Sequence, residues 1–128
     1  MPASDAERIA AAGAYITALI TNEGDAVPFA PDCTRVEQGM KNGFSGNHLR
    51  RSLSRGPQYR VIGATTEPDY TVDGDEVTAR YDVLTKVSLG GRRLAAHVDE
   101  TFLIPARDGR IHHIRVRFTP FLARASQH

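Results

Sequence analysis

Hydrophobic and polar residues alternate with a period of two from Tyr59 almost to the C-terminus, and this pattern most constrains the fold. Three turn signals divide the stretch, namely Asp73-Gly74, Gly90-Gly91 and Asp108-Gly109. Because strands joined by such short turns pair with their neighbours, the pattern predicts a meander of four antiparallel strands. We expect the strands at about residues 59–70, 75–89, 92–105 and 110–121.

The first half of the chain has the helical period instead. Ser4-Asp5-Ala6-Glu7 matches a capping box, and apolar residues then recur at helical spacing from Ile9 to Ile20. Asn22-Glu23-Gly24 is a typical end for this helix. A second helix is predicted at about 47–55, with Gly56-Pro57 as its stop. Helices followed by an antiparallel meander indicate an α+β fold in which the helices cover one face of a curved sheet.

Length and charge exclude several classes of function. The chain has 128 residues, which fits a single domain over 1–128, and no apolar run is long enough to span a membrane. The net charge is only +1, so the arginine cluster of Arg50, Arg51, Arg55 and Arg60 is interpreted as a solvated face rather than a nucleic-acid site. We expect no membrane partner and no nucleic-acid partner. The N-terminus lacks the features of a secretion signal, and the single cysteine, Cys33, suits a cytoplasmic protein in which this residue is small and buried.

Strand parity assigns the two faces of the predicted sheet, because side chains two apart point the same way. One face is apolar and is predicted to face the core. The other face carries both positive and negative charges and is interpreted as solvated or as a polar homodimer surface. The side chains predicted to face the core are Val77, Ala79, Tyr81, Val83, Val87, Leu89, Leu94, Ala96, Val98, Phe102, Ile104, Ile114, Val116 and Phe118. Those predicted on the opposite face are Arg80, Asp82, Lys86, Arg93, His97, Asp99, His113, Arg115 and Arg117.

Two polar residues fall on the apolar face by this count. Glu100 shares a side with Val98 and Phe102, and His112 shares a side with Ile114. A charged group in an apolar interior costs several kcal/mol unless it is paired or neutralised, and burial raises the pKa of a carboxyl. Either the two residues satisfy each other or they line a cavity, and both alternatives stay open at this point.

The segment PDCTRVEQGMKNGFSG, residues 31–46, places a carboxylate where a short strand opens into a glycine-rich loop. A solvated surface acid explains Glu37, and so does a catalytic base at the mouth of a pocket. No set of His, Cys, Asp and Glu residues in the sequence has the spacing that is typical of metal ligands, so we expect no metal site.

The capped first helix with its tyrosine, the stretch PFAPDCTRVEQG and the four-strand meander together resemble the nuclear transport factor 2-like superfamily. The local match is to the ketosteroid isomerases and the SnoaL-like polyketide cyclases, and uncharacterised actinobacterial and fungal domains carry a similar segment. The resemblance implies a cone-shaped α+β fold around an apolar pocket. It also implies that a small apolar molecule binds there and that no cofactor is needed. From the charged outer face of the sheet, we further expect a homodimer.

The resemblance further implies the roles of individual residues. Glu37 falls on the general base of ketosteroid isomerases, and Glu100 falls on their protonated acid if the following hairpin is one residue longer here. Tyr15 takes the place of the tyrosine that donates to the substrate oxygen, and His112 is a candidate helper. The residues expected to line the pocket are Tyr81, Val98, Phe102, Val116 and Phe118. The alternative is a non-catalytic ligand-binding or dimerisation domain, with Tyr15 as plain core and His112 as a core histidine satisfied by Glu100 or Tyr81.

Overall fold

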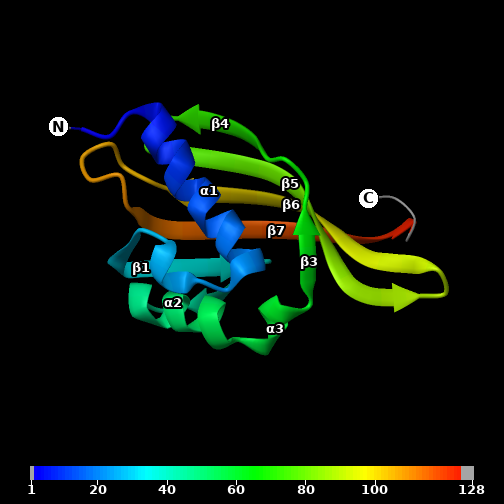
Figure 1. Cartoon of the computed structure of the whole chain (residues 1–128). Helices are drawn as coiled ribbons and strands as arrows, with labels where there is room; N and C mark the ends of the chain where they lie inside the picture. The colour runs from blue at the N-terminus through cyan, green and yellow to red at the C-terminus, as the bar shows by residue number, and fades with distance from the viewer. Residues whose placement is uncertain (1, 125–128) are drawn as a thin grey trace.

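A computed structural model describes residues 2–124, and its centre is one curved sheet of seven strands covered on one face by helices (Figure 1). The helical elements are α1 (Asp5–Thr21), the 3-10 turn η1 (Gly24–Ala26), α2 (Gly46–Arg55) and α3 (Pro57–Arg60). The strands are β1 (Phe29–Glu37), β2 (Met40–Gly43), β3 (Ile62–Thr65), β4 (Asp69–Asp73), β5 (Glu76–Leu89), β6 (Arg92–Leu103) and β7 (Ile111–Arg124). Their order across the sheet is β2-β1-β7-β6-β5-β3, and β4 also pairs with β5. The α+β cone expected from the sequence is confirmed.

Helix α1 begins and ends where the local signals predict. The Ser4 hydroxyl accepts from the backbone N–H of Glu7, and the Glu7 carboxylate accepts from the N–H of Ser4. Asn22 has a left-handed backbone and its N–H donates to the carbonyl of Ala18, which closes the last turn. The helix lies diagonally across the sheet in Figure 1, with its apolar side against the strands.

The predicted strands at 75–89, 92–105 and 110–121 correspond to β5, β6 and β7, but the one at 59–70 is wrong. That stretch contains the end of α3, all of β3 and the start of β4. Pro57 occupies the first turn of α3, where a missing N–H costs nothing, and Pro68 interrupts the alternation between β3 and β4. With β1 and β2 added, the sheet has seven strands among residues 2–124 instead of four.

The strand that contains Cys33 and Glu37 joins the sheet beside its last strand. β1 runs parallel to β7, with Thr34 opposite His113 and Glu37 opposite Val116, and a bulge absorbs the residues between Phe29 and Thr34. The predicted glycine-rich loop after Glu37 is largely a hairpin, because Gln38 and Gly39 turn the chain with positive φ and β2 pairs back onto β1. In Figure 1, β1 lies next to β7, although about 80 residues separate them in sequence.

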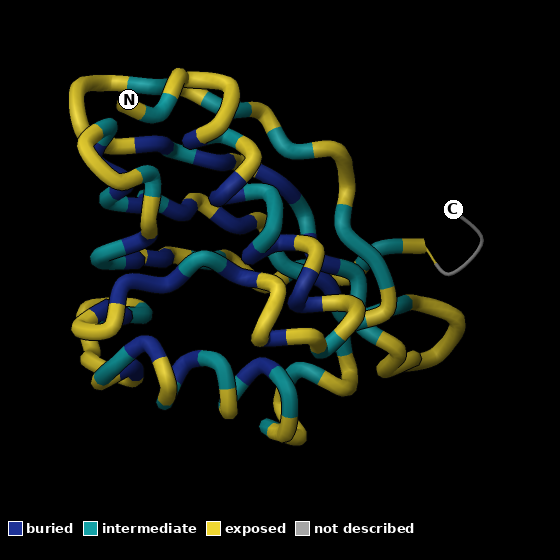
Figure 2. The backbone as a smooth tube through the Cα atoms, turned by 60° about the vertical axis from the view of Figure 1, so that its left-hand side comes forward, coloured by how far each residue is buried: buried dark blue, intermediate teal, exposed yellow. Residues whose placement is uncertain are grey.

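The core lies between α1 and the inner face of the sheet, where buried segments concentrate in Figure 2. Parity is confirmed for Val77 to Val83 on β5, for Val98 and Phe102 on β6, and for Ile104 just after that strand. It is wrong for Val87 and Leu89, which are exposed because the β5–β6 hairpin extends past the helices and its register shifts after Leu84. None of the helices in residues 2–124 is long and apolar enough to cross a membrane.

Candidate functional site

A pocket of about 400 Å³ lies between the inner face of the sheet and the segment around α3. This volume is within the range of small-molecule sites, and most of the lining is apolar with a few polar groups among it. The lining residues are Tyr15, Leu19, Arg35, Glu37, Asn42, Gln58, Tyr59, Val61, Ile62, Tyr81, Val83, Thr85, Ala96, Val98, Glu100, Val116 and Phe118. Three of the four residues proposed from the sequence for catalysis, Glu37, Glu100 and Tyr15, therefore surround one pocket.

Glu37 and Glu100 belong to a single row across the sheet. Glu37 on β1 is opposite Val116 on β7, and Val116 is in turn opposite Glu100 on β6. Since neighbouring strands are 4.7–4.9 Å apart, the backbones that carry the two carboxyls are separated by roughly 10 Å. The space over Val116 between them belongs to the pocket.

Glu100 is fully buried, and its Oε1 accepts a hydrogen bond of 2.7 Å from the Tyr81 hydroxyl. Burial raises the pKa of this carboxyl to about 7, against the opposing effects of the Arg35 charge and the Tyr81 hydrogen bond. The nearby Glu37 carboxylate adds to the increase. Both the protonated and the ionised form of Glu100 are therefore populated near neutral pH.

Arg35 is the polar centre of the pocket, and the sequence analysis did not identify it. Its Nε donates to the Tyr15 hydroxyl over 2.9 Å, and its Nη2 donates to Oε1 of Glu37 over 3.0 Å. The side chain of Arg35 is 6% exposed, whereas that of Glu37 is 37% exposed. Strand parity could have identified Arg35 from the sequence. Arg35 lies two residues after the buried Cys33 and two before Glu37, so the three side chains point to the same face of the strand.

The tyrosines of the pocket keep their protons. Burial raises the pKa of Tyr15 and of Tyr81 well above its ordinary range, and it also raises that of Tyr59. Tyr15 packs edge-on against Phe102, with the ring centroids 5.5 Å apart. The Tyr15 oxygen accepts from Arg35, and the hydroxyl still has an O–H that can act as a donor.

Four of the five residues that were predicted to line the pocket do so. Tyr81, Val98, Val116 and Phe118 line the pocket. Phe102 does not, because it is fully buried beneath Tyr15 and belongs to the core.

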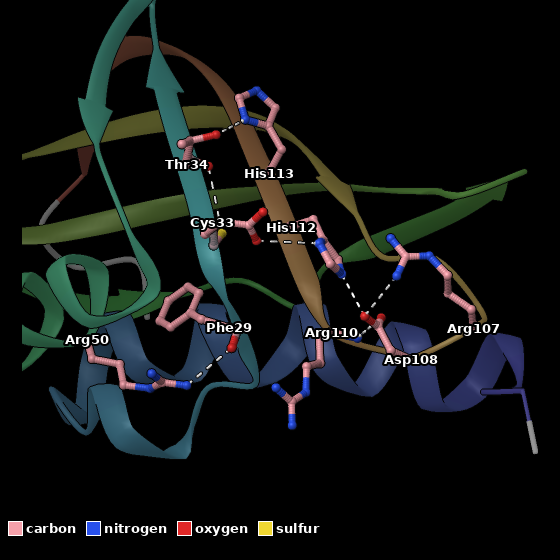
Figure 3. A network of polar contacts seen from close by, with 10 residues as sticks. Phe29, Cys33, Thr34, Arg50, Arg107, Asp108, Arg110, His112 and His113 are labelled. Atoms are coloured by element: carbon pink, nitrogen blue, oxygen red, sulfur yellow. Dashed lines mark hydrogen bonds and ion pairs between the residues drawn. The ribbon is translucent and has the colours of Figure 1, made fainter.

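His112 is not brought to the pocket. Its Nε2 lies 2.7 Å from Oδ2 of Asp108, and its Nδ1 lies 3.9 Å from Oδ1 of Asp32. Figure 3 shows the ring reaching toward Asp108, while the neighbouring His113 turns to Thr34. The expected contact with Glu100 or Tyr81 is wrong because the pairing of β7 with β6 begins at His113, so parity no longer governs the preceding residue.

Cys33 is buried, as predicted, and burial raises the pKa of its thiol to about 12. A protonated thiol is a poor nucleophile, so this residue serves packing. Within residues 2–124, no group of three or more His, Cys, Asp or Glu residues is placed to hold a metal ion.

A second depression, of about 620 Å³, lies on the outer face of the sheet and is lined mainly by exposed polar and charged side chains. These side chains pair with one another, as in Arg80 with Asp99 and His97 with Asp82. Exposed pairs of this kind are screened by water and interact weakly. The inner pocket, with its buried acid and buried guanidinium, is therefore the better candidate site.

Solved structures similar to this chain have the same fold. An epoxide hydrolase described as LEH-like, from Mycobacterium tuberculosis, has a TM-score of 0.71 and 23% identity, over 89% of this chain and 84% of that one. An NTF-2 like protein of unknown function from Burkholderia xenovorans has a TM-score of 0.66 and 15% identity, over 94% and 85%. AclR, a putative hydroxylase from Streptomyces galilaeus, has a TM-score of 0.64 and 17% identity, over 91% of each chain. At these identities the likeness shows the fold alone, and that fold is NTF2-like.

Among the curated proteins, no match to this chain was found. The family description "Domain of unknown function (DUF8021)" matches residues 2–118, which is most of the chain. The chain therefore belongs to this family, and its fold is NTF2-like.

Proposed function

We propose that the inner pocket is an active site for cofactor-free proton transfer next to the carbonyl group of a small apolar molecule. The observation that carries the proposal is the row Glu37–Val116–Glu100, which puts two carboxyls on opposite sides of one pocket. Their surroundings differ, since Glu37 is partly exposed beside Arg35 and Glu100 is buried with a pKa raised to about 7. A pair of acids in different environments is the usual basis for dividing base and acid roles.

In this mechanism, a carboxylate oxygen of Glu37 removes a proton from the carbon next to the carbonyl. The C–H electron pair forms the carbon–carbon double bond of an enolate, and the carbonyl electrons move to the oxygen. Protonated Glu100 and the Tyr15 hydroxyl donate hydrogen bonds to that oxygen, where negative charge develops. Donors fixed in a pocket with little water stabilise such charge most effectively. Glu37 then returns the proton to the same carbon or to a conjugated one.

The experiment is deuterium exchange at the carbon next to the carbonyl of 1-tetralone in D2O, followed by proton NMR. The native protein is expected to accelerate the exchange, and Glu37→Gln is expected to lower the rate by at least about 100-fold, the usual contribution of a general base. Glu23→Gln is the matched control, because Glu23 is exposed and lies outside the pocket. Equal exchange rates for the Glu37→Gln variant and the native protein would exclude Glu37 as the base.

A second candidate, suggested by the epoxide hydrolase among the similar structures, is addition of water to a strained cyclic ether. The observation that favours it is an acid with a pKa of about 7 across the pocket from the Glu37 side chain. Glu37 would take a proton from water, the water oxygen would attack a ring carbon, and Glu100 would protonate the ring oxygen as its C–O bond breaks. Hydrolysis of styrene oxide with loss of activity in Glu100→Gln would support this reaction instead of enolisation.

A further inference from the structure

One segment of the chain holds an excess of positive charge. Residues 38–66 contain no Asp or Glu, and their basic residues are Lys41, Arg50, Arg51, Arg55 and Arg60. The segment therefore carries +5 and the rest of the chain carries −4, which together give the net charge of +1. It forms β2, α2, α3 and β3. The small net charge of the chain thus conceals a separation of charge within the molecule.

The two helices of this segment lie along one edge of the molecule, below β1 in Figure 1, and the outward side of α2 is exposed in Figure 2. Arg51 and Arg55, four residues apart, share that outward side, and Lys41 and Arg60 are also exposed. These four residues form the basic edge. The fifth cation of the segment instead donates to a backbone carbonyl of β1. Within residues 2–124, no ion pair involves a residue of the basic edge, so all four remain available to an anionic partner.

Three acidic residues border the basic edge without pairing with it. Glu23 and Asp25 are exposed at η1, which is joined to α2 by the hydrogen bond from the N–H of Gly24 to the Ser54 hydroxyl. Glu37, just before the β1–β2 turn, forms its ion pair with a buried arginine instead. The basic edge therefore keeps a local excess of positive charge.

Exposed apolar side chains accompany these cations. Met40 is 75% exposed, Phe44 is 60% exposed and Val61 is 43% exposed. The Lys41 ammonium lies 5.2 Å from the centroid of the Phe44 ring, and that centroid lies 5.3 Å from the one of His48 on α2. Apolar side chains among unpaired cations suit the surface of an anionic bilayer, because the apolar groups enter the acyl boundary while the cations contact headgroup phosphates.

The inner pocket opens beside the same edge. Its lining includes Asn42 on β2, Gln58 on α3 and Val61 directly after α3, and all three residues are exposed. Since exposed lining residues mark the rim of a pocket, the mouth lies between β2 and α3. The mouth, the basic edge and the exposed apolar side chains therefore belong to one side of the molecule.

We propose that the basic edge, together with Met40 and Phe44, docks the protein on the surface of an anionic lipid bilayer, with the mouth of the pocket toward the membrane. The negative charge of the rest of the chain favours this orientation, because an anionic surface repels it. An apolar molecule dissolved in the bilayer would then enter the pocket without crossing water. The expectation of no membrane partner rested on the net charge and on the lack of a spanning segment, whereas surface docking depends on how the charge is distributed.

A nucleic acid is the other extended polyanion that positive charge could attract. Single strands bind where several aromatic side chains offer successive stacking surfaces. Phe44 is the only exposed aromatic residue in the segment 38–66, and its ring already lies against Lys41 and His48. Base stacking also gives no role to the exposed Met40 side chain. These observations favour lipid as the partner.

Sedimentation of the full chain with sucrose-loaded vesicles tests the proposal. One set of vesicles contains phosphatidylcholine alone, and the other contains equal parts of phosphatidylcholine and phosphatidylglycerol. In about 50 mM NaCl, the native protein is expected to bind the mixed vesicles at least about tenfold more tightly than the neutral ones. In about 500 mM NaCl this preference should be largely lost, because salt screens exposed charges.

Two double variants test the residues of the surface. Arg51→Gln combined with Arg55→Gln should weaken binding to the mixed vesicles by at least about tenfold, since each surface cation contributes roughly fivefold. Met40→Ser combined with Phe44→Ser should also weaken this binding by at least about tenfold, because it removes the groups that enter the acyl boundary.

The matched control is Arg80→Gln combined with Arg117→Gln, which removes the same charge from the outer face of the sheet. It should change binding by less than about threefold. All the substituted side chains are exposed, so the variants should keep the native fold, which circular dichroism checks.

Equal binding of the native protein to the two kinds of vesicle would overturn the proposal. Equal losses in the control and in the Arg51 and Arg55 variant would also overturn it, since net charge alone would then account for binding. Unchanged binding in the Met40 and Phe44 variant would overturn the apolar contact. Tighter binding to a labelled single-stranded oligonucleotide than to mixed vesicles, lost in the Arg51 and Arg55 variant, would assign the basic edge to nucleic acid instead. None of these readouts uses deuterium exchange, so lipid docking and the proposed catalysis succeed or fail separately.

Discussion

Glu37 and Glu100 lie two strands apart in the same row of the sheet, with Val116 between them. The two carboxyls are similar in chemistry and differ in surroundings, because one reaches partly into solvent and the other is enclosed by the core. Arg35 donates a hydrogen bond to Glu37, while burial favours the neutral form of Glu100. This asymmetry leads to a measurable dependence of stability on pH.

Glu100 should make the native protein less stable as pH rises. Its pKa is about 7 in the folded protein and 4.5 in its ordinary state, so between these values the folded state binds the extra proton. The contribution of Glu100 to the unfolding free energy is largest below about pH 4.5. It decreases as the pH rises to 7 and does not change further above that pH. The shift corresponds to about 3 kcal/mol of unfolding free energy. Urea unfolding at pH 4.5 to 8 measures this effect. The unfolding free energy of Glu100→Gln should increase by this amount, relative to that of the native protein, between the two ends of the pH range.

The matched variant for this series is Asp99→Asn, on the same strand but on the outer face, where the side chain is 54% exposed. Its unfolding free energy should follow that of the native protein at each pH. Parallel curves for Glu100→Gln and the native protein would show that Glu100 has no raised pKa. Gln keeps an acceptor for the Tyr81 hydroxyl, so the comparison isolates the charge.

The Arg8 side chain connects α1 to two separate hairpins through hydrogen bonds. It is 4% exposed, its Nε donates to the carbonyl of Ile104 over 2.6 Å, and its Nη2 donates to that of Gly74 over 2.6 Å. Arg8→Met should lower the unfolding free energy by about 2–4 kcal/mol, because both carbonyls lose charged donors. Arg80→Met, at a side chain 68% exposed, should change it by less than about 0.5 kcal/mol. Chemical unfolding of the two variants measures the difference, and similar losses would contradict the structural role of Arg8.

Gln38 extends the pairing of β1 with β7 directly after Glu37. Its Nε2 donates to the carbonyl of Phe118, and its Oε1 accepts from the N–H of Phe118. Gln38→Ala should cost about 1 kcal/mol and make the Phe118 amide exchange with solvent several times faster, as seen by hydrogen exchange NMR. Gln38→Glu keeps the acceptor and should protect that amide. Unchanged exchange at Phe118 in Gln38→Ala would show that the side chain does not secure the strand end.

The elements that depend on near neighbours can be predicted from the sequence alone. The Ser4–Glu7 capping box, the Asn22 helix end and the turns at Gly74, Gly90 and Gly109 are local, and each appears where predicted. Within paired strands, parity also determined that Glu100 faces the core, since side chains two apart share a face. The same rule misplaced His112 because it lies just before the part of β7 that pairs with β6.

Which of these residues come into contact depends on the packing of segments that are distant in sequence. The parallel pairing of β1 with β7 joins segments far apart in sequence, and no local signal specifies a partner at such a distance. That pairing puts Glu37 opposite Val116 and Arg35 opposite Ile114, and it thereby brings the guanidinium to Tyr15 of the first helix. The pKa of Glu100 follows from the same packing, because it depends on how completely distant segments exclude water.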